Sequence, residues 1–438
     1  MSELRIDQAP EKPHGTGELP RRPRLHPAWI VAVVGFVALL GAAGFRSVPG
    51  VLMDPLHDEF GWSHATIGAA VSLNMVLYGA ISPFAAALME RFGIRLVVSC
   101  ALVLVAAGSG LTVFMTQSWQ LMATWGLMVG VGVGSMSMPF VATITGRWFV
   151  KQRGLVTGVL TAAGSTGQLV FLPLIAWLAN HHGWRTPALL VSAAALAVVP
   201  LVLVFIRDYP SDIGHTAYGA GPGDESGLRT SHPGGMTRAL VVLGRIVRKP
   251  VFWLLAGTFA ICGATTNGLV QTHFVSAAHD HGMPATTAAG LLSVVGIFDI
   301  AGTIASGWFT DRMDSRYLLI TYYALRGLSL FVLPILLKPE VQPPIWAFII
   351  FYGLDWIATV PPTVALCREH FGADGPVAFG WVFASHQVGA ALAAFGAGLI
   401  RDTQGSYNLA WFIAGGLCAI AAVLSAGIRR HRADVAIA

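Results

Sequence analysis

The stretch Gly307-Trp-Phe-Thr-Asp-Arg-Met-Asp-Ser-Arg316 places four charged residues within six positions, between two long apolar runs. A more divergent copy, Ala86-Ala-Leu-Met-Glu-Arg-Phe-Gly-Ile-Arg95, lies 221 positions earlier. The same offset pairs further residues: Gly61 with Gly282, Ser72 with Ser293, Arg147 with Arg368 and Gly154 with Gly375. A constant offset at so many points indicates an internal duplication. We therefore predict two similar halves, each with a charged turn after its second hydrophobic segment.

The composition is that of a membrane protein. Of the 438 residues, 55% are hydrophobic and only 11% are charged, which leaves too few polar residues to cover a soluble surface. The apolar residues form runs of about 20, the length that crosses a bilayer as a helix. Strands are excluded because a lone strand cannot satisfy its backbone in lipid, and the alternation of a barrel strand is absent. The predicted fold is all-α and polytopic.

The hydrophobic runs fall into two groups of six around a polar segment. We expect spans near 28–53, 64–89, 95–115, 119–143, 154–179 and 185–206, and then near 250–278, 285–310, 316–337, 343–366, 376–400 and 407–428. This divides the chain into a polar tail (1–27), a first bundle (28–206), a linker (207–249), a second bundle (250–428) and a short tail (429–438). We expect the middle of the linker, His215 to Met236, to be flexible because it is rich in Gly and Pro.

Basic residues predict the orientation. Of the 27 Lys and Arg, 22 lie in alternate loops, the linker and the two tails, and the opposite loops hold only Arg185, Lys338 and Arg401. Because basic loops stay in the cytoplasm, both termini and the linker are expected inside, in a cytoplasmic membrane. The pI of about 9.2 does not indicate nucleic-acid binding, since the basic residues form no patch.

Four charges lie inside the expected spans: Arg46, Asp299, Arg326 and Asp355. Each costs about 2.5–3.5 kcal/mol at the bilayer centre, so such residues face a partner, water or the bundle interior. Arg46 is either an anchor for a substrate carboxylate or a side chain that extends outward toward Asp54 and Asp58. Asp299 is either a proton carrier or the structural partner of Arg326.

Other polar residues within spans are weaker candidates for a cavity lining. They are Asn74, Tyr78, Thr266, Asn267, Gln271, His273, His386 and Gln387. The alternative is that they hydrogen-bond between helices. For Arg326 and Asp355 a structural role leads. Pro361 and Pro362 should break the tenth span near its inner end, which frees carbonyls that need a partner.

Motifs for enzymatic or nucleotide chemistry are missing. The chain contains no GxxxxGK[ST], HExxH or GxSxG, and its four cysteines show no metal-binding spacing. We therefore expect no enzyme activity, no metal and no cofactor, and a driving force that comes from a gradient.

The repeated GxxxDRxGxR-like turn, together with two sets of six spans, resembles the major facilitator superfamily. The first copy departs from the pattern, with Ala86 for the usual Gly and Glu90 for the usual Asp. The stretch Arg147-Trp-Phe-Val-Lys-Gln-Arg-Gly154, followed by Gly158, Gly164, Gly167 and Pro173, is similar to the fifth-span signature of monocarboxylate transporters and their bacterial relatives. The resemblance places Arg46 at a substrate-contacting position and Asp299 at a coupling position. Thr303 stands where that family has an arginine, so either Arg326 supplies the cation from the ninth span or the substrate differs from simple monocarboxylates.

The resemblance implies two six-helix bundles around a central cavity that opens alternately to either side. It also implies a gate on the cytoplasmic side, formed by the two charged turns: Glu90, Arg91, Arg95, Gly307, Asp311, Arg312 and Arg316. The expected function is proton-coupled transport of a small organic anion. The expected substrate-binding residues are Arg46, Asn74, Tyr78, Asn267, Gln271 and His386. The expected proton-coupling residues are Asp299, Arg326 and Asp355. A monomer suffices for such a cavity. The alternatives are a proton-driven exporter of amphipathic compounds and a non-transporting membrane sensor.

Overall fold

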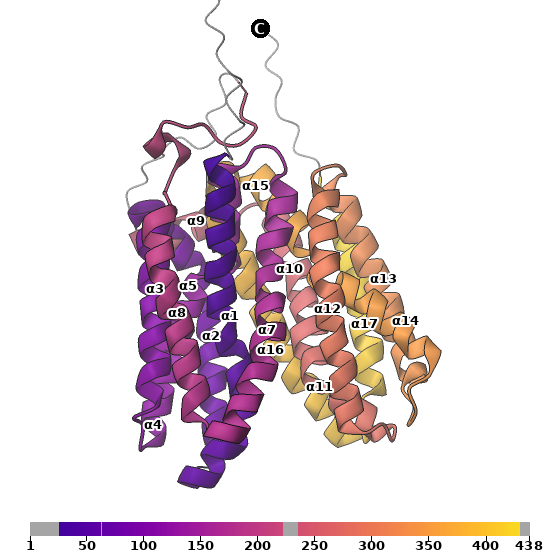
Figure 1. Cartoon of the computed structure of the whole chain (residues 1–438). Helices are drawn as coiled ribbons and strands as arrows, with labels where there is room; N and C mark the ends of the chain where they lie inside the picture. The colour runs from indigo at the N-terminus through magenta and orange to yellow at the C-terminus, as the bar shows by residue number, and fades with distance from the viewer. Residues whose placement is uncertain (1–25, 63, 222–234, 430–438) are drawn as a thin grey trace, which may run out of the picture.

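The computed structural model describes residues 26–62, 64–221 and 235–429. Within some helices the side chains of further residues, Arg46 among them, lie outside this description. The described residues form helices joined by short turns, with one isolated β-bridge between Phe149 and Tyr218. Figure 1 shows two helical bundles side by side, one from each half of the chain.

The first half begins with α1 (Pro27–Phe60). Proline suits its first position because the N–H it lacks would be unpaired there, and the His26 side chain accepts from Ala28 N at 3.2 Å. Gly61 ends the helix with φ of +66°, a conformation that favours glycine. The remaining helices of this half are α2 (His64–Phe92), α3 (Ile94–Thr112), the segmented span α4 (Ser118–Leu121), η1 (Met122–Val129), α5 (Gly130–Ser135) and α6 (Met138–Trp148), then α7 (Arg153–His182) and α8 (Arg185–Phe205).

The second half follows a short helix of the linker, α9 (Gly235–Ile246). Its first span is continuous through α10 (Pro250–Gly263), the π-helical η3 (Ala264–Val270) and α11 (Gln271–Asp280). It continues with α12 (Ala285–Thr310), α13 (Ser315–Leu336), α14 (Pro343–Asp355), α15 (Val360–Phe371), α16 (Gly375–Gln404) and α17 (Asn408–Ala426). The prediction of two six-helix bundles in an all-α fold is confirmed.

The helices have the length and apolarity of membrane spans. Ten stretches of the described chain qualify, one of them (Pro343–Arg401) covering two spans, and the described apolar part of α1 is shorter. Large apolar side chains such as Leu392, Phe395 and Val423 are exposed on the outside, at 69%, 76% and 72%. A surface of this kind suits hydrocarbon rather than water. The chain is a multi-pass membrane protein.

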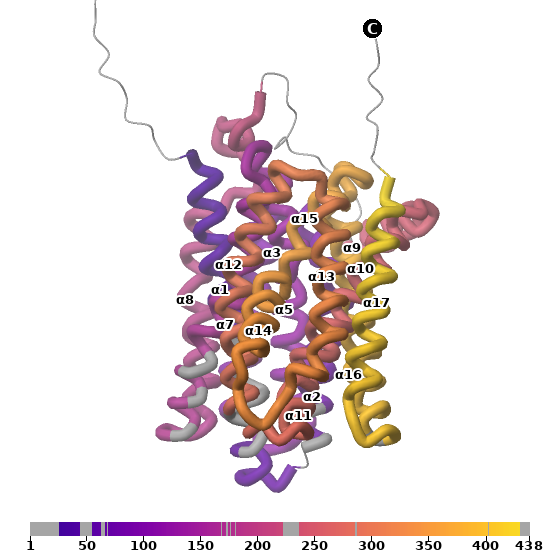
Figure 2. The backbone as a smooth tube through the Cα atoms, turned by 90° about the vertical axis from the view of Figure 1, so that its right-hand side faces the viewer, coloured from indigo at the N-terminus to yellow at the C-terminus, as the bar shows by residue number. Residues whose placement is uncertain are grey.

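The two halves meet most tightly at one end of the bundle, which we call the termini end because α1 begins and α17 ends there. It is the upper end in Figure 1, and Figure 2 shows the same end from the side of the second half. A Cβ added at Gly154 or Gly307 would overlap the backbone of the other, and one at Gly158 would lie 2.5 Å from the Thr303 carbonyl oxygen. α7 and α12 therefore cross in direct backbone contact between the halves.

The linker is more ordered at its edges than its composition suggests. Tyr218 N donates to Trp148 O at 2.8 Å, and Tyr218 O accepts from Val150 N at 2.9 Å. At the other edge, α9 begins at Gly235, one residue before the expected end of the flexible segment. The prediction of flexibility from His215 to Met236 is thus wrong for Tyr218 and Met236, because backbone pairing and an amphipathic pattern override the Gly and Pro content. Residues 222–234 lie outside the described part of the chain.

Candidate functional site: a buried carboxyl between the two halves

Asp299 lies near the middle of α12 and is 1% exposed. Its Oδ1 accepts from Thr303 Oγ1 at 2.9 Å and from Ile357 N at 3.0 Å. Its Oδ2 accepts from the Ser165 hydroxyl. Ser165 belongs to α7 of the first half, so one carboxyl joins both halves and the tenth span. Thr303, one turn further along α12, is one of the three donors.

The tenth span is interrupted beside this carboxyl. α14 ends at Asp355 and α15 begins at Val360, which leaves a non-helical turn at 356–359. Pro361 and Pro362 explain the interruption, because neither can donate to a carbonyl one turn earlier. The Ala358 carbonyl that Pro362 cannot reach accepts from Ser306 Oγ at 2.5 Å instead. The predicted break is confirmed, and it lies just before the proline pair.

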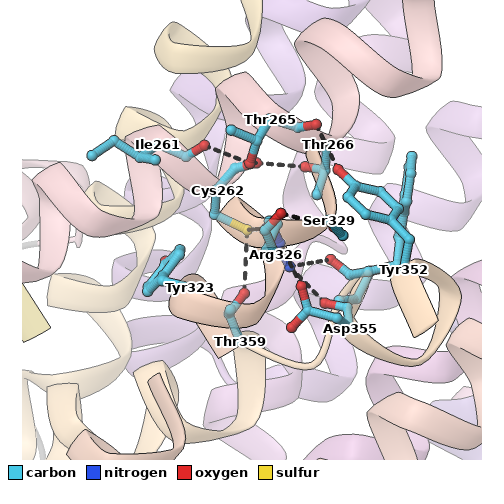
Figure 3. A network of polar contacts seen from close by, with 12 residues as sticks. Ile261, Cys262, Thr265, Thr266, Tyr323, Arg326, Ser329, Tyr352, Asp355 and Thr359 are labelled. Atoms are coloured by element: carbon cyan, nitrogen blue, oxygen red, sulfur yellow. Dashed lines mark hydrogen bonds and ion pairs between the residues drawn. The ribbon is translucent and has the colours of Figure 1, made fainter. Parts of the chain in front are cut away.

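The open backbone groups of the break are bound by Arg326 (Figure 3). Its Nη2 donates to Asp355 O at 2.5 Å and to Trp356 O at 3.2 Å. Its Nε donates to Asp355 Oδ2 at 2.6 Å, and its Nη1 to Cys262 Sγ at 3.1 Å. Arg326 is 0% exposed and Asp355 is 4% exposed. A buried pair of opposite charges in this setting holds α10, α13 and the break together.

The ion pair corrects one sequence-based alternative. Arg326 pairs with Asp355 and not with Asp299. The sequence gives the depth of each residue along its span, and by depth alone both Asp299 and Asp355 could reach Arg326. It does not give the rotation of each helix about its axis, which decides the partner. Asp299 instead satisfies its oxygens with neutral donors. Asp355 Oδ1 has no hydrogen-bond partner among the described residues.

The residues predicted to line a cavity are spread over different surroundings. The Arg46 side chain lies outside the described set, although its backbone is in α1. Asn74 is buried and donates to Trp125 O at 2.9 Å within the first half. Tyr78 packs edge-on against Phe383 of α16, with ring centroids 5.3 Å apart, and so lies between the halves.

The candidates of the second half divide in the same way. Asn267 and Gln271 have exposed side chains. His386 is 8% exposed and packs against the rings of Phe259 and Phe383, at 4.9 and 5.8 Å. His273 is bound between helices, to Ala394 O at 2.9 Å and to the Tyr407 hydroxyl at 3.2 Å. Among the described residues, no group of His, Cys, Asp or Glu has the arrangement of a metal site.

The charged turn of the second half binds the first half. Asp311 Oδ1 accepts from Gly154 N at 2.6 Å, and Oδ2 accepts from Leu155 N at 2.8 Å. A carboxylate at a helix N-terminus satisfies open N–H groups and is favoured by the helix dipole. Gly307 supports this contact by its close packing on Gly154. Arg312 lies over the Trp308 ring and Arg316 pairs with Asp314, both within the second half.

The charged turn of the first half cannot repeat this geometry. The 221 offset puts Pro376 in the place of Leu155, and proline has no N–H to donate. Glu90 instead pairs with Arg238 of α9, which also binds Asp374 at 2.7 Å. Arg95 contributes its backbone N to Asp208 at 3.0 Å, and Arg91 lies over the Phe92 ring. The linker helix thereby connects the two halves at the termini end.

A cavity of about 740 Å³ lies between the halves at this end. It is lined by α6 and α7 from the first half and by α15 and the start of α16 from the second. Arg368 crosses it and donates to Gly146 O at 3.0 Å. Its counterpart Arg147 donates to Met89 O at 3.1 Å within the first half. The two arginines related by duplication thus differ in what they join.

Several of these residues were not singled out as site residues from the sequence. Ser165 is a small polar residue in a Gly-rich stretch and carries no signal of its own. Arg238 and Asp374 lie outside the spans, where charges are expected in any case. Arg368 did have a signal, since the duplication pairs it with Arg147.

Two similar six-helix bundles with interrupted helices and an intramembrane carboxyl between them are the architecture of a secondary transporter. The family model described as Major Facilitator Superfamily matches residues 34–376. The chain belongs to this superfamily, whose members are transporters and not enzymes.

Known proteins similar to the chain agree with this assignment. The MFS-type transporter YcxA of Bacillus subtilis, itself uncharacterized, is 26% identical over 87% of this chain and 90% of its own length. Monocarboxylate transporter 13 of Bos taurus is 27% identical, over 88% and 86%. Among solved structures, the proton:xylose symporter XylE bound to a bromodeoxyglucose is similar in fold, with a TM-score of 0.69, 15% identity, and coverage of 92% of this chain and 95% of that one.

Proposed function

We propose that this transporter moves a small organic anion, a carboxylate, together with a proton across the cytoplasmic membrane. The observation that carries the proposal is the position of Asp299, a buried carboxyl that binds the first half through Ser165 and the break of the tenth span through Ile357. A group that titrates at such a joint would couple proton binding to the movement of the two halves. The similarity to proteins named monocarboxylate transporters supports a carboxylate as substrate.

The hydrogen-bond count suggests how coupling works. An ionised carboxyl is only an acceptor, and the three donors around Asp299 match it. A proton on Asp299 converts one carboxyl oxygen into a hydroxyl donor and makes it a poorer acceptor, so the contact at that oxygen weakens or rearranges. Loss of the Ser165 contact would loosen α7 from α12 and favour separation of the halves at the termini end. The Asp299 carboxyl would release its proton once the halves have closed at the end opposite the termini end.

The substrate would bind between the halves, with Arg46 as its anchor. A guanidinium offers two parallel donors that match a carboxylate. Tyr78 and His386 are proposed to contact the substrate from the aromatic group around Phe383, since this group lies where α2 meets α16. Asn74, Asn267 and Gln271 remain proposed contacts. Asn74 would first have to release Trp125 O.

We assign the termini end to the cytoplasm because most of the basic residues lie there. Asp311, Arg368 and the Glu90–Arg238–Asp374 group would then form the cytoplasmic gate, and their contacts between the halves would hold it closed. A single chain supplies every residue of the proposed site and gate, so we propose that the monomer transports.

Asp311→Asn should weaken the gate. An amide keeps the shape but loses the charge that caps α7, and we expect the balance to shift toward the state open at the cytoplasm by about 1–3 kcal/mol, the usual range of coupling energies. Cysteines introduced beside Thr310 should react faster with a reagent supplied from the cytoplasmic side. Wild-type reactivity together with wild-type transport would exclude the gate role. Arg312→Gln, which alters a neighbouring charge that stays within the second half, is the matched control.

Counterflow in proteoliposomes tests the substrate class. Vesicles loaded with an unlabelled short-chain carboxylate should take up the radiolabelled acid, whereas vesicles with Arg46→Ala should lose nearly all of this exchange. Transport of amphipathic compounds without any carboxylate exchange would favour an exporter. Binding of carboxylates with no exchange at all would favour a non-transporting sensor.

A further inference from the structure

The Ile357 N–H is free to donate to Asp299 only because the tenth span is broken. In a continuous helix this group would donate to Gly353 O, but Trp356 N occupies that carbonyl at 3.1 Å. The direction of Ile357 N is therefore set by the turn at 356–359. The conformation of this turn depends on the donor that binds the carbonyls of Asp355 and Trp356.

We infer that Arg326 is a positioning residue for the coupling carboxyl: by binding the carbonyls of Asp355 and Trp356, it holds the break so that Ile357 N donates to Asp299. This inference rests on the proposed role of Asp299. The guanidinium suits the task because its planar set of donors reaches the Asp355 carboxylate and both carbonyls at once. The Asp355 carboxylate neutralises the charge of Arg326 and orients its guanidinium.

The break also connects Asp299 to the gate. α15 starts at the break and runs for 12 residues, about 18 Å at 1.5 Å per residue. Near its far end Arg368 donates to Gly146 O of the first half. A change in the hydrogen bond between Asp299 and Ile357 would move the start of this rigid helix. Its end would then shift against the first half, so that the protonation state of Asp299 reaches the gate.

The charged and titratable surroundings of Asp299 leave Arg326 as its nearest influence. α7 contributes the Ser165 hydroxyl, α13 contributes Arg326, and α14 contributes Asp355, which is paired with Arg326. Tyr322 of α13 lies beside Ser306 and faces Asp355. The packed helices α7, α11, α13, α14 and α15 also carry other titratable groups: Arg153, His181, His182, His273, His279, Asp280, Arg316, Tyr317, Tyr323, Tyr352, Arg368, Glu369 and His370.

Arg326→Lys tests the inference. Lysine keeps the charge beside Asp355, but its single ammonium cannot bind the Asp355 carboxylate and the carbonyls of Asp355 and Trp356 at once. Asp299 should therefore lose part of its contact with Ile357 N. We expect carboxylate exchange to persist in proteoliposomes. The midpoint of its pH profile should move upward by about one pH unit, because the ionised carboxyl loses a donor. Tyr323→Phe is the matched control: it removes a buried hydrogen bond to Thr258 O one turn away on α13 without touching the break.

Ser306→Ala provides a second variant should Arg326→Lys fail to insert. It frees the Ala358 carbonyl and disturbs the break without changing any charge, and the midpoint should move in the same direction. A midpoint equal to that of Tyr323→Phe in both variants would overturn the role of Arg326, while the proposed function would stand. A wild-type profile that does not depend on pH, or does not change in Asp299→Asn, would overturn the proposed function itself.

Discussion

Arg326→Ala should remove most of the folded protein from the membrane. The substitution leaves the Asp355 carboxylate buried without its partner and frees the carbonyls of Asp355 and Trp356. Breaking one side of a buried ion pair typically costs about 3–5 kcal/mol, which is a large part of the stability of most domains. We expect the yield of monodisperse protein after detergent extraction to fall strongly, and the remaining protein to unfold at a clearly lower Tm.

The double variant Arg326→Leu/Asp355→Leu separates charge from hydrogen bonding. It removes the uncompensated charge, so it should recover part of the yield that Arg326→Ala loses. It should not recover fully, because the two carbonyls of the break still lack a donor. Wild-type yield and Tm in Arg326→Ala alone would mean that the pair does not hold the second half together.

Asp299→Asn should abolish uphill transport while it spares exchange. Asparagine has nearly the shape of the protonated acid but cannot release a proton, so the cycle loses its link to the pH gradient. For one proton per substrate, a gradient of about one pH unit can drive roughly tenfold accumulation, because about 1.4 kcal/mol corresponds to a factor of ten. We expect the wild-type protein to approach this ratio and Asp299→Asn to stay near one.

The same vesicles provide the control for Asp299→Asn. Counterflow of the labelled carboxylate without a pH gradient should be largely retained, since it needs no net proton movement. Thr303→Val is the matched variant, because it removes a donor to Asp299 but keeps the carboxyl, and it should still accumulate substrate. If Asp299→Asn accumulates substrate as the wild type does, the proton site lies elsewhere, with Asp355 and His386 as the next candidates.

The fold follows from the sequence to an unusual extent because membrane spans and an internal duplication are both long-range patterns. The 221 offset aligns Glu90 with Asp311, and the apolar runs give most of the spans within a few residues, although α1 extends to Phe60 and not to 53 as expected. Pro361 and Pro362 also predict the break, because the missing N–H of a proline disrupts a helix whatever its tertiary contacts are.

The site is less predictable because it depends on which way helices face. Asp299 and Asp355 lie at similar depths, and only the packed structure shows that Arg326 binds the second of them. The partner of Glu90 depends equally on the three-dimensional arrangement, because Arg238 comes from a polar linker in which no single charge stands out. Ser165 becomes notable only once α7 lies against α12.

Proton movement together with substrate is the most direct measure of coupled transport. Proteoliposomes with a pH-sensitive dye inside are given a carboxylate gradient directed inward at equal internal and external pH. If transport is coupled to protons through Asp299, the interior acidifies in step with uptake of the radiolabelled acid, well beyond what protein-free liposomes show by diffusion of the neutral acid. This excess disappears in Asp299→Asn. Uptake by the wild-type protein without this excess acidification would contradict proton-coupled carboxylate transport.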